Sequence, residues 1–144
     1  MSRRRYAALL FDLDGTLIDS MPLHHRAWQR WHRRHGLPFD EHGFFQATAG
    51  RTNAEILREL LPALDDAQRR ALADEKEALY RELAEQMLQP VGGALQLLQS
   101  ARAGGQRLAV CTASPPENLG IAVARFRLDR RVDAITSPAD GLRG

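Results

Sequence analysis

The chain has 144 residues, which suffices for one ordinary domain or for a small domain with an inserted module. Hydrophobic residues make up 44% and charged residues 26%, a composition that excludes disorder, and no apolar run approaches the roughly 20 residues of a membrane span. The formal net charge is only +2, and apart from Arg3 to Arg5 the arginines are interspersed with acids, so we expect neither nucleic-acid nor membrane partners.

The single cysteine, Cys111, excludes an intramolecular disulfide and is typical of a reducing compartment. The apolar stretch near the N-terminus is too short for a secretory signal and reaches Asp12 without a cleavage site, so we expect a cytoplasmic protein. Cys111 ends an apolar run, and we expect its thiol to be packed in the core.

A buried strand is predicted where Ala7 to Phe11 form a continuous apolar run. Asp12 and Asp14 follow it, two residues apart. Because side chains alternate along a strand, both carboxylates are expected on one side, at the end of this strand. Gly15 then permits a sharp turn.

Four successive helices are predicted after this strand, from the spacing of apolar residues and from capping residues. Asp19 or Ser20 can cap the first helix, and residues 52–55 (TNAE) form a capping box before the third. The predicted spans are 22–36, 40–49, 56–61 and 66–88. The last of these carries charges on one face and an apolar row on the other: Leu72, Leu79, Leu83 and Met87.

After Gly92-Gly93, helix and strand alternate. Helices are predicted at 94–103 and from Pro115 to 126, the latter opened by a capping box formed by Ser114 and Glu117, and strands at 107–111 and 132–135. This order predicts an α/β fold, with a doubly wound parallel sheet that is interrupted by an inserted helical module.

The chemistry is expected where these strands end, because ligands of an open parallel sheet bind beyond its carboxyl ends. Thr112 ends the second strand, and Ser114 stands at a helix start, which favours an anion. Asp12 and Asp14 would repel a phosphate unless a hard divalent cation, Mg²⁺, were present. One aspartate can then attack phosphorus while the other transfers a proton.

Residues 11–20 (FDLDGTLIDS), with Pro22 and His24 after them, resemble the first motif of the haloacid dehalogenase superfamily, in the group that contains beta-phosphoglucomutase and small sugar phosphatases. Residues 49–57 resemble its cap loop and residues 109–114 its second motif. The resemblance implies that Asp12 is the nucleophile and a metal ligand, and that Asp14 is the general acid and base and holds the metal through its backbone carbonyl. It also implies a phosphate-binding group: Thr112, Ala113 and Ser114.

The resemblance further implies a core formed by residues 1–19 and 89–144 and a helical cap, residues 20–88, that closes over the site. Substrate contacts from the cap are expected from His24, Trp28, Gly50, Arg51 and Asn53, with packing in the cap as the alternative role of Trp28. Other residues of this segment are expected to have no such role: Trp31 in the cap core, and His25, His32, His35 and His42 at the surface.

Two departures from the family pattern decide between reactions. Mutases of the family hold a second phosphate with basic residues in the cap loop. This chain has Ala49 and Asn53 at those positions, although Arg51 lies nearby. The second departure is Thr16, which follows the phosphatase pattern. We therefore expect a magnesium-dependent phosphatase of small phosphorylated metabolites, mainly sugar phosphates. The alternatives are a phosphosugar mutase and a non-catalytic fragment that binds phosphate or associates with itself.

The resemblance places residues 139–144 just before the third motif, whose lysine would follow. The only lysine, Lys76, lies in the expected cap and cannot replace it. We therefore expect this chain to be the N-terminal portion of a monomeric phosphatase, and to be weakly active or inactive alone. Its first strand would lie at an open sheet edge, where another copy could pair.

Overall fold

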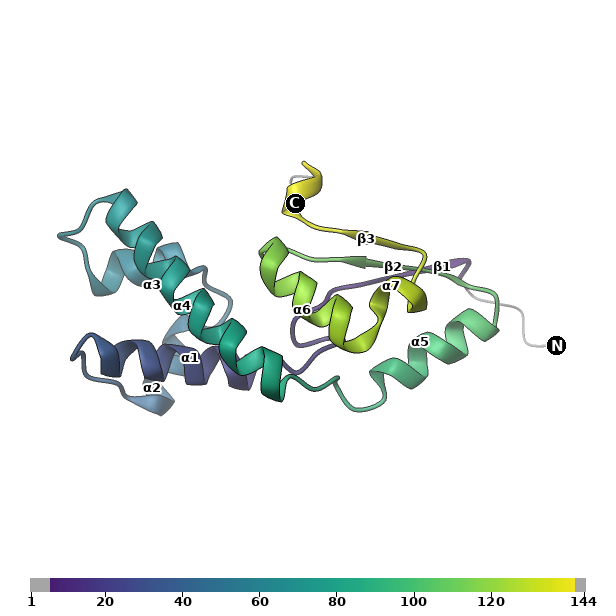
Figure 1. Cartoon of the computed structure of the whole chain (residues 1–144), viewed down its shortest axis with the longest axis horizontal. Coiled ribbons are helices and arrows are strands. Elements are labelled where there is room, and N and C mark those ends of the chain that lie inside the picture. The colour runs from purple at the N-terminus through teal and green to yellow at the C-terminus, as the bar shows by residue number, and fades with distance from the viewer. Residues whose placement is uncertain (1–5, 142–144) are drawn as a thin grey trace. The chain divides into compact units, whose positions relative to one another are not determined.

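The computed structural model describes residues 6–141 and combines a small parallel sheet with helices (Figure 1). Strands β1 (Ala8–Phe11), β2 (Arg107–Cys111) and β3 (Ala134–Thr136) lie in the order β1-β2-β3, and both pairs are parallel. The predicted α/β fold is confirmed. The helices are α1 (Met21–Arg34), α2 (Glu41–Thr48), α3 (Asn53–Leu60), α4 (Asp66–Met87), α5 (Ala94–Ala103), α6 (Pro116–Phe126), α7 (Leu128–Arg131) and the 3-10 turn η1 (Pro138–Asp140).

The chain divides into two compact units. Within the described residues, one unit contains the sheet and comprises residues 6–21 and 84–141, and the other is the helical segment Pro22–Leu83. The assignment of core and cap to residues 1–19, 20–88 and 89–144 stays a prediction. No helix among residues 6–141 has the length and apolar character needed to cross a membrane.

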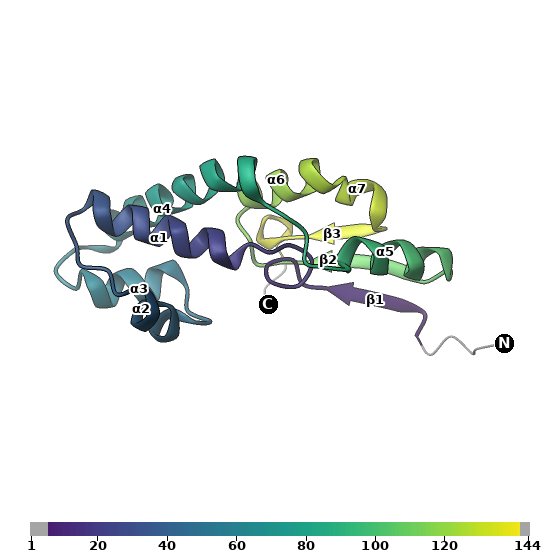
Figure 2. The same ribbon diagram turned by 90° about the horizontal axis from the view of Figure 1, so that it is seen from below.

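One face of the sheet carries the core of its unit. Helices α5, α6 and α7 all lie on this face (Figures 1 and 2), where Leu108 and Val110 of β2 are buried. The connections from β1 to β2 and from β2 to β3 are crossovers of the same hand and run in the same direction across the sheet. Their helices therefore lie on the same face of the sheet. On the opposite face Leu10 is 74% exposed and the Cys111 thiol is exposed, so the prediction of a packed thiol was wrong. Among the described residues of this unit, no helix covers that face (Figures 1 and 2).

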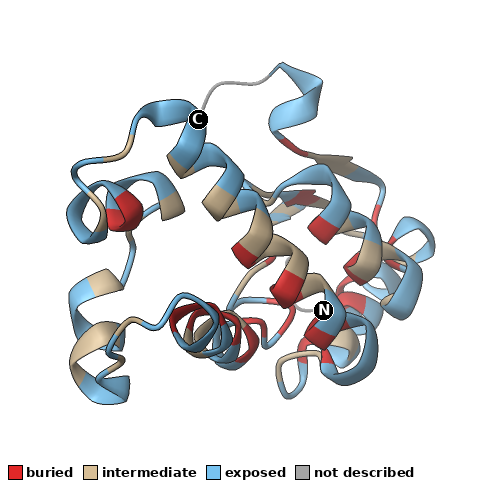
Figure 3. Cartoon of the chain, turned by 60° about the vertical axis from the view of Figure 1, so that its left-hand side comes forward, coloured by how far each residue is buried: buried red, intermediate tan, exposed pale blue. Residues whose placement is uncertain are grey.

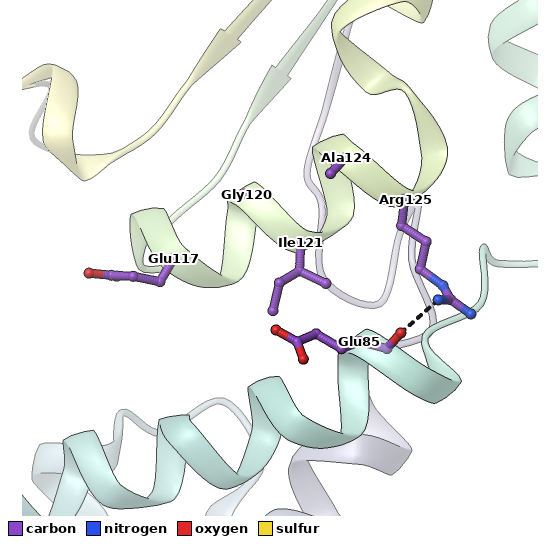
Figure 4. A pocket seen from close by; sticks show the side chains of 6 residues that line it. All are labelled: Glu85, Glu117, Gly120, Ile121, Ala124 and Arg125. Atoms are coloured by element: carbon purple, nitrogen blue, oxygen red, sulfur yellow. Dashed lines mark hydrogen bonds between the residues drawn. The ribbon is translucent and has the colours of Figure 1, made fainter.

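Arg125 of α6 holds the C-terminal end of α4. One of its terminal nitrogens donates to the carbonyl oxygen of Glu85 at 2.9 Å (Figure 4). Its Nε donates to the carbonyl oxygen of Leu88 at 2.7 Å, and its other terminal nitrogen donates to that of Gln86 at 3.3 Å. The last carbonyls of a helix have no partner within the helix, and a cation is favoured at this negative end. One side chain thus caps α4 and joins it to α6.

The capping predictions had different outcomes. The Thr52–Glu55 capping box is confirmed, and α3 begins directly after Thr52, at Asn53 rather than at 56. Ser20 is fully buried before α1, yet its hydroxyl has no hydrogen-bond partner among the described residues, so it does not cap that helix.

Helices α1, α3 and α4 each bury part of their surface and expose the rest (Figure 3), whereas α2 has no buried residue. In α4, Leu79 and Leu83 are buried as predicted, but Lys76 and Tyr80 share their face and are buried too. Met87, expected on the apolar face, is 42% exposed. The separation of charges from the apolar face of α4 was therefore wrong at Lys76.

An aromatic cluster forms where α1 meets the segment that follows it. Trp31 is fully buried, which confirms its place in the core, and His32 is only 1% exposed, so the surface prediction for His32 was wrong. The ring of His32 packs against those of Phe39 and Phe44, with centroids 4.9 Å away in each case. Its Nδ1–H donates to the carbonyl oxygen of Trp28 at 2.9 Å.

The burial of His32 makes the stability of this unit depend on pH. Desolvation lowers the pKa of His32 below its ordinary 6.5 and outweighs the hydrogen bond to Trp28, which raises it. Between the folded pKa and 6.5 the unfolded chain binds a proton that the folded chain does not. The contribution of His32 to the free energy of unfolding should therefore be complete above pH 6.5. Below pH 6.5 the free energy of unfolding should fall by up to about 1.4 kcal/mol per pH unit.

Urea midpoints measured between about pH 5 and 8 check this dependence. In His32→Asn the amide nitrogen can replace the Nδ1 donor, but the side chain cannot titrate, so the slope should be lost. The same substitution at the exposed His42 should leave it in place. An unchanged slope in His32→Asn would contradict the assignment.

Candidate active site

The first carboxylate of the candidate site stands directly after β1. Asp12 is exposed, and its Oδ1 accepts a hydrogen bond from the backbone N–H of Leu13 at 2.7 Å. The chain then turns at Gly15, which has a φ of +72° and donates its N–H to the carbonyl oxygen of Ile18 at 2.9 Å. A residue with a side chain is strained at that φ, so glycine makes this tight turn possible.

The loop after β2 supplies two hydroxyl groups to the site, those of Thr112 and Ser114. The N–H of Thr112 donates to the carbonyl oxygen of Thr136 at 3.1 Å, which continues the pairing with β3. Thr112 Oγ1 accepts from the N–H of Ser114 at 3.0 Å. Because that oxygen serves as an acceptor, the Thr112 hydroxyl hydrogen is left to donate to a bound anion.

The parallel register brings the two strand ends together. Phe11 is the partner of Val110, so continuing the register by three residues places Asp14 opposite Ala113, beside Ser114. The Ser114 hydroxyl donates a hydrogen bond to Asp14 Oδ2. The structure thus joins Asp14, Ser114 and Thr112 into one hydrogen-bonded group.

The predicted capping box of α6 was wrong. The N-cap is Pro115, which has no side chain that could cap, and Pro116 is the first helical residue. The Ser114 hydroxyl lies one residue too early to cap and is bonded to Asp14 instead. Ala113 is exposed between the two hydroxyl residues.

The oxygen ligands at this end of the sheet fit a magnesium ion. Mg²⁺ is usually held by one or two carboxylates and completed by water and substrate phosphate. Asp12 supplies one such carboxylate and Asp14 can add its backbone carbonyl oxygen, and among residues 6–141 no cluster of three or more histidine, cysteine or acidic side chains offers a fuller protein cage. This donor set suits a metal that is shared with a phosphorylated ligand.

The candidate residues of the helical unit form a second cluster, around a buried lysine. Lys76 is 2% exposed, and its ammonium donates to Nδ1 of His24 at 2.8 Å and to Oε1 of Glu77 at 2.9 Å. The His24 ring stacks on Tyr80 with centroids 3.8 Å apart and planes 6° from parallel. The Lys76 ammonium also lies 5.5 Å from the ring centroid of Trp28, within cation–π range.

Asn53 joins this cluster through its side chain. Its Nδ2 donates to the same Oε1 of Glu77 at 2.6 Å. Three of the predicted cap residues, His24, Trp28 and Asn53, therefore meet around the Lys76–Glu77 pair. Sequence reasoning missed this pair, although Lys76 lies four residues after Leu72 and three before Leu79, which places it on their helix face.

The remaining two cap candidates lie in the turn between α2 and α3. Gly50 has a φ of +74°. The Arg51 guanidinium forms an ion pair with Glu59 at 2.7 Å and donates to the carbonyl oxygens of Ala47 and Glu55, both at 3.3 Å. These partners of Arg51 lie in α2 and α3.

A cavity of about 520 Å³ opens beside Arg125, in the unit that contains the sheet (Figure 4). None of the predicted site residues lines it. The lining residues are Glu85, Glu117, Gly120, Ile121, Ala124 and Arg125.

Comparisons with known proteins agree with this arrangement. The family model of the haloacid dehalogenase-like hydrolases matches residues 6–141. The chain is 30% identical over 137 residues to fructose-1-phosphate phosphatase YqaB of Escherichia coli, covering 92% of this chain and 70% of that protein. It is 30% identical over 140 residues to validoxylamine A 7'-phosphate phosphatase of Streptomyces hygroscopicus subsp. limoneus, covering 96% and 65%.

A solved structure supports the same assignment. The crystal structure of a HAD hydrolase from Entamoeba histolytica has a TM-score of 0.83 at 27% identity, with 96% of this chain and 64% of that chain covered. This chain belongs to the haloacid dehalogenase-like hydrolases, as the resemblance of residues 11–20 indicated. It spans less than two thirds of the length of the Streptomyces relative and of the Entamoeba structure.

The buried Lys76–Glu77 pair should contribute more to stability than an exposed pair does. Lys76→Met removes the Lys76 ammonium from the mostly buried Glu77 carboxylate, so we expect the free energy of unfolding to fall by about 3 kcal/mol. The matched change Arg34→Met, at the more exposed Arg34–Glu75 pair, should cost at most about 1 kcal/mol.

Urea denaturation of both variants gives the comparison. Lys76→Met combined with Glu77→Gln should recover part of the loss, because the unpaired charge is removed. Equal losses in Lys76→Met and Arg34→Met would contradict a special role for burial of the pair.

Proposed function

We propose that the residues of this chain serve the magnesium-dependent hydrolysis of phosphate monoesters of small metabolites, mainly sugar phosphates, in the cytoplasm. The observation that carries the proposal is the hydrogen-bonded group Asp14–Ser114–Thr112, at the strand ends next to Asp12. Two relatives, a fructose-1-phosphate phosphatase and a validoxylamine A 7'-phosphate phosphatase, support this substrate class.

In the first step a carboxylate oxygen of Asp12 attacks phosphorus. The bond between phosphorus and the ester oxygen breaks, and the departing alkoxide takes a proton from the Asp14 carboxyl group, which leaves an alcohol and an aspartyl phosphate at Asp12. The Thr112 hydroxyl can donate a hydrogen bond to an oxygen of the transferred phosphoryl group.

In the second step Asp14, now a carboxylate, takes a proton from a water molecule. The water oxygen attacks phosphorus, the bond to Asp12 breaks, and inorganic phosphate leaves while both side chains return to their starting states. A magnesium ion, which the Asp12 carboxylate and the backbone carbonyl oxygen of Asp14 would hold, would supply positive charge that offsets the repulsion between the carboxylates and the phosphate.

Hydrolysis is favoured over a mutase reaction by the contacts of Arg51. A mutase must hold a second phosphate, and Arg51 is the basic residue nearest to the predicted place for it. Its guanidinium is already paired with Glu59 at 2.7 Å and bonded to two backbone carbonyls. Binding a second phosphate there would require those contacts to be replaced.

Replacing the proposed nucleophile tests the function. Asp12→Asn keeps the size of the side chain but removes the attacking carboxylate, so release of phosphate from a panel of sugar phosphates with Mg²⁺ should fall by at least about 1,000-fold. The assay uses the 144-residue chain in excess over substrate, so that weak turnover is detected. Where the gene encodes more residues, the longer product is assayed in parallel.

Asp19→Asn is the matched control, since Asp19 is exposed on the same loop and has no place in the proposed chemistry. Its activity should stay within about twofold of wild type. Retained activity in Asp12→Asn would remove Asp12 from its role. Saturable phosphate binding without turnover in the wild type would favour the non-catalytic alternative.

Self-association is a second candidate property, favoured by the open edge of the sheet. Among the described residues no strand pairs with the outer edge of β1, whose four residues are all apolar. An unpaired apolar edge presents backbone donors and acceptors to a second chain.

A charge placed on this strand should reduce association. Leu10→Lys, at a side chain that is 74% exposed, should lower the concentration-dependent rise in apparent mass measured by light scattering. Leu97→Lys changes a side chain that is 51% exposed on helix α5 and should leave the rise unchanged. A wild-type mass that is independent of concentration, or equal effects of both variants, would contradict pairing through β1.

A further inference from the structure

We propose that Ser114 is the positioning residue for the proton transfer at Asp14: its hydroxyl holds the Asp14 carboxyl in one orientation and leaves Oδ1 as the oxygen that exchanges the proton. This inference rests on the proposed phosphatase function. It differs from the expectation that Ser114 binds the phosphate, because it assigns the hydroxyl hydrogen to Asp14.

The backbone around Ser114 is fixed by two kinds of constraint. Its N–H donates to Thr112 Oγ1 at 3.0 Å, which ties it to the end of β2. Pro115 and Pro116 follow, with Pro115 at φ −54° and ψ 145°. The ring of a proline fixes its own φ and restricts the residue before it to extended conformations. Ser114 therefore presents its side chain from a backbone with few alternatives.

The single hydrogen of the Ser114 hydroxyl is directed to Asp14 Oδ2. A serine hydroxyl has one donor, so in this arrangement it does not also donate to a phosphate oxygen. Because Oδ2 accepts that hydrogen bond, a proton on the carboxyl group is more readily carried by Oδ1. Thr112, whose oxygen accepts from Ser114 and whose hydrogen is not engaged there, stays the donor toward the phosphate.

This division of roles has a kinetic signature that depends on the leaving group. An alkoxide leaving group needs the proton from Asp14, whereas p-nitrophenolate leaves without one. Loss of the Ser114 hydroxyl should therefore slow the cleavage of an alkyl phosphate more than that of p-nitrophenyl phosphate. A residue that binds the transferred phosphoryl group, or that only supports the fold, would affect both substrates alike.

The test compares kcat/KM of the wild-type chain and Ser114→Ala for a hexose 6-phosphate and for p-nitrophenyl phosphate, with Mg²⁺. We expect Ser114→Ala to lose about 10- to 100-fold on the hexose phosphate and less than about twofold on the aryl phosphate. Ser114→Thr keeps the hydroxyl and should restore the ratio of the two values. Ser100→Ala, on an exposed position of α5, is the matched control and should leave both values unchanged.

Equal losses on both substrates, no loss on either, or a ratio that Ser114→Thr does not restore would each overturn the inference. If the wild-type chain hydrolyses neither substrate, the proposed function fails for this chain, and a measurement without turnover decides the inference. The Hα–Hβ couplings of Asp14 in NMR spectra should indicate one side-chain rotamer in the wild type and an average over several in Ser114→Ala. Identical couplings in both proteins would overturn it.

Discussion

The parallel register of β1 and β2 is the constraint on which the candidate site depends. Phe11 pairs with Val110, and β3 extends the same order, so the chain leaves each strand at the same edge. Asp14 and Ser114, 100 residues apart in sequence, meet because their strands end at the same level. A shift of one residue would turn every strand side chain to the other face and separate the two loops. Hydrogen bonds between backbones thus set the geometry of the side-chain chemistry.

The three strands and helices α1 to α6, with their order along the chain, could be predicted because each has a local signal, whereas α7 and η1 were not predicted. Apolar runs mark β1 and β2, and the Thr52–Glu55 box needs only residues three apart. The Lys76 cluster had a weaker signal. Helical spacing places Lys76 on the buried face, but its charge argued for solvent, and only the folded unit shows that Glu77 and His24 offset the cost of burying it. Whether a charged residue on an apolar helix face is buried thus depends on partners that can lie far away in the sequence.

Where prediction failed, a tertiary contact had replaced the local rule. Ser114 has the sequence of a helix cap, but Asp14 competes for its hydroxyl and is held within reach by the sheet. His32 is polar in sequence, yet its ring is enclosed by aromatic residues from the following segment. Cys111 follows a buried pattern, but the helices α5, α6 and α7 of its own unit cover only the other face of the sheet, and Cys111 is exposed. These outcomes depend on which elements pack together, which periodicity alone does not reveal.

The contact between Arg125 and the C-terminal end of α4 affects which residues at this contact can be substituted during evolution. The guanidinium binds carbonyl oxygens, which every amino acid carries, so the identity of Glu85 and Gln86 is irrelevant to the bond. The donor is far less replaceable, because three nitrogens of a planar group reach three separate oxygens, and a lysine has one nitrogen. Selection on this contact should therefore constrain Arg125, while the side chains of the residues whose carbonyl oxygens it binds are free to vary.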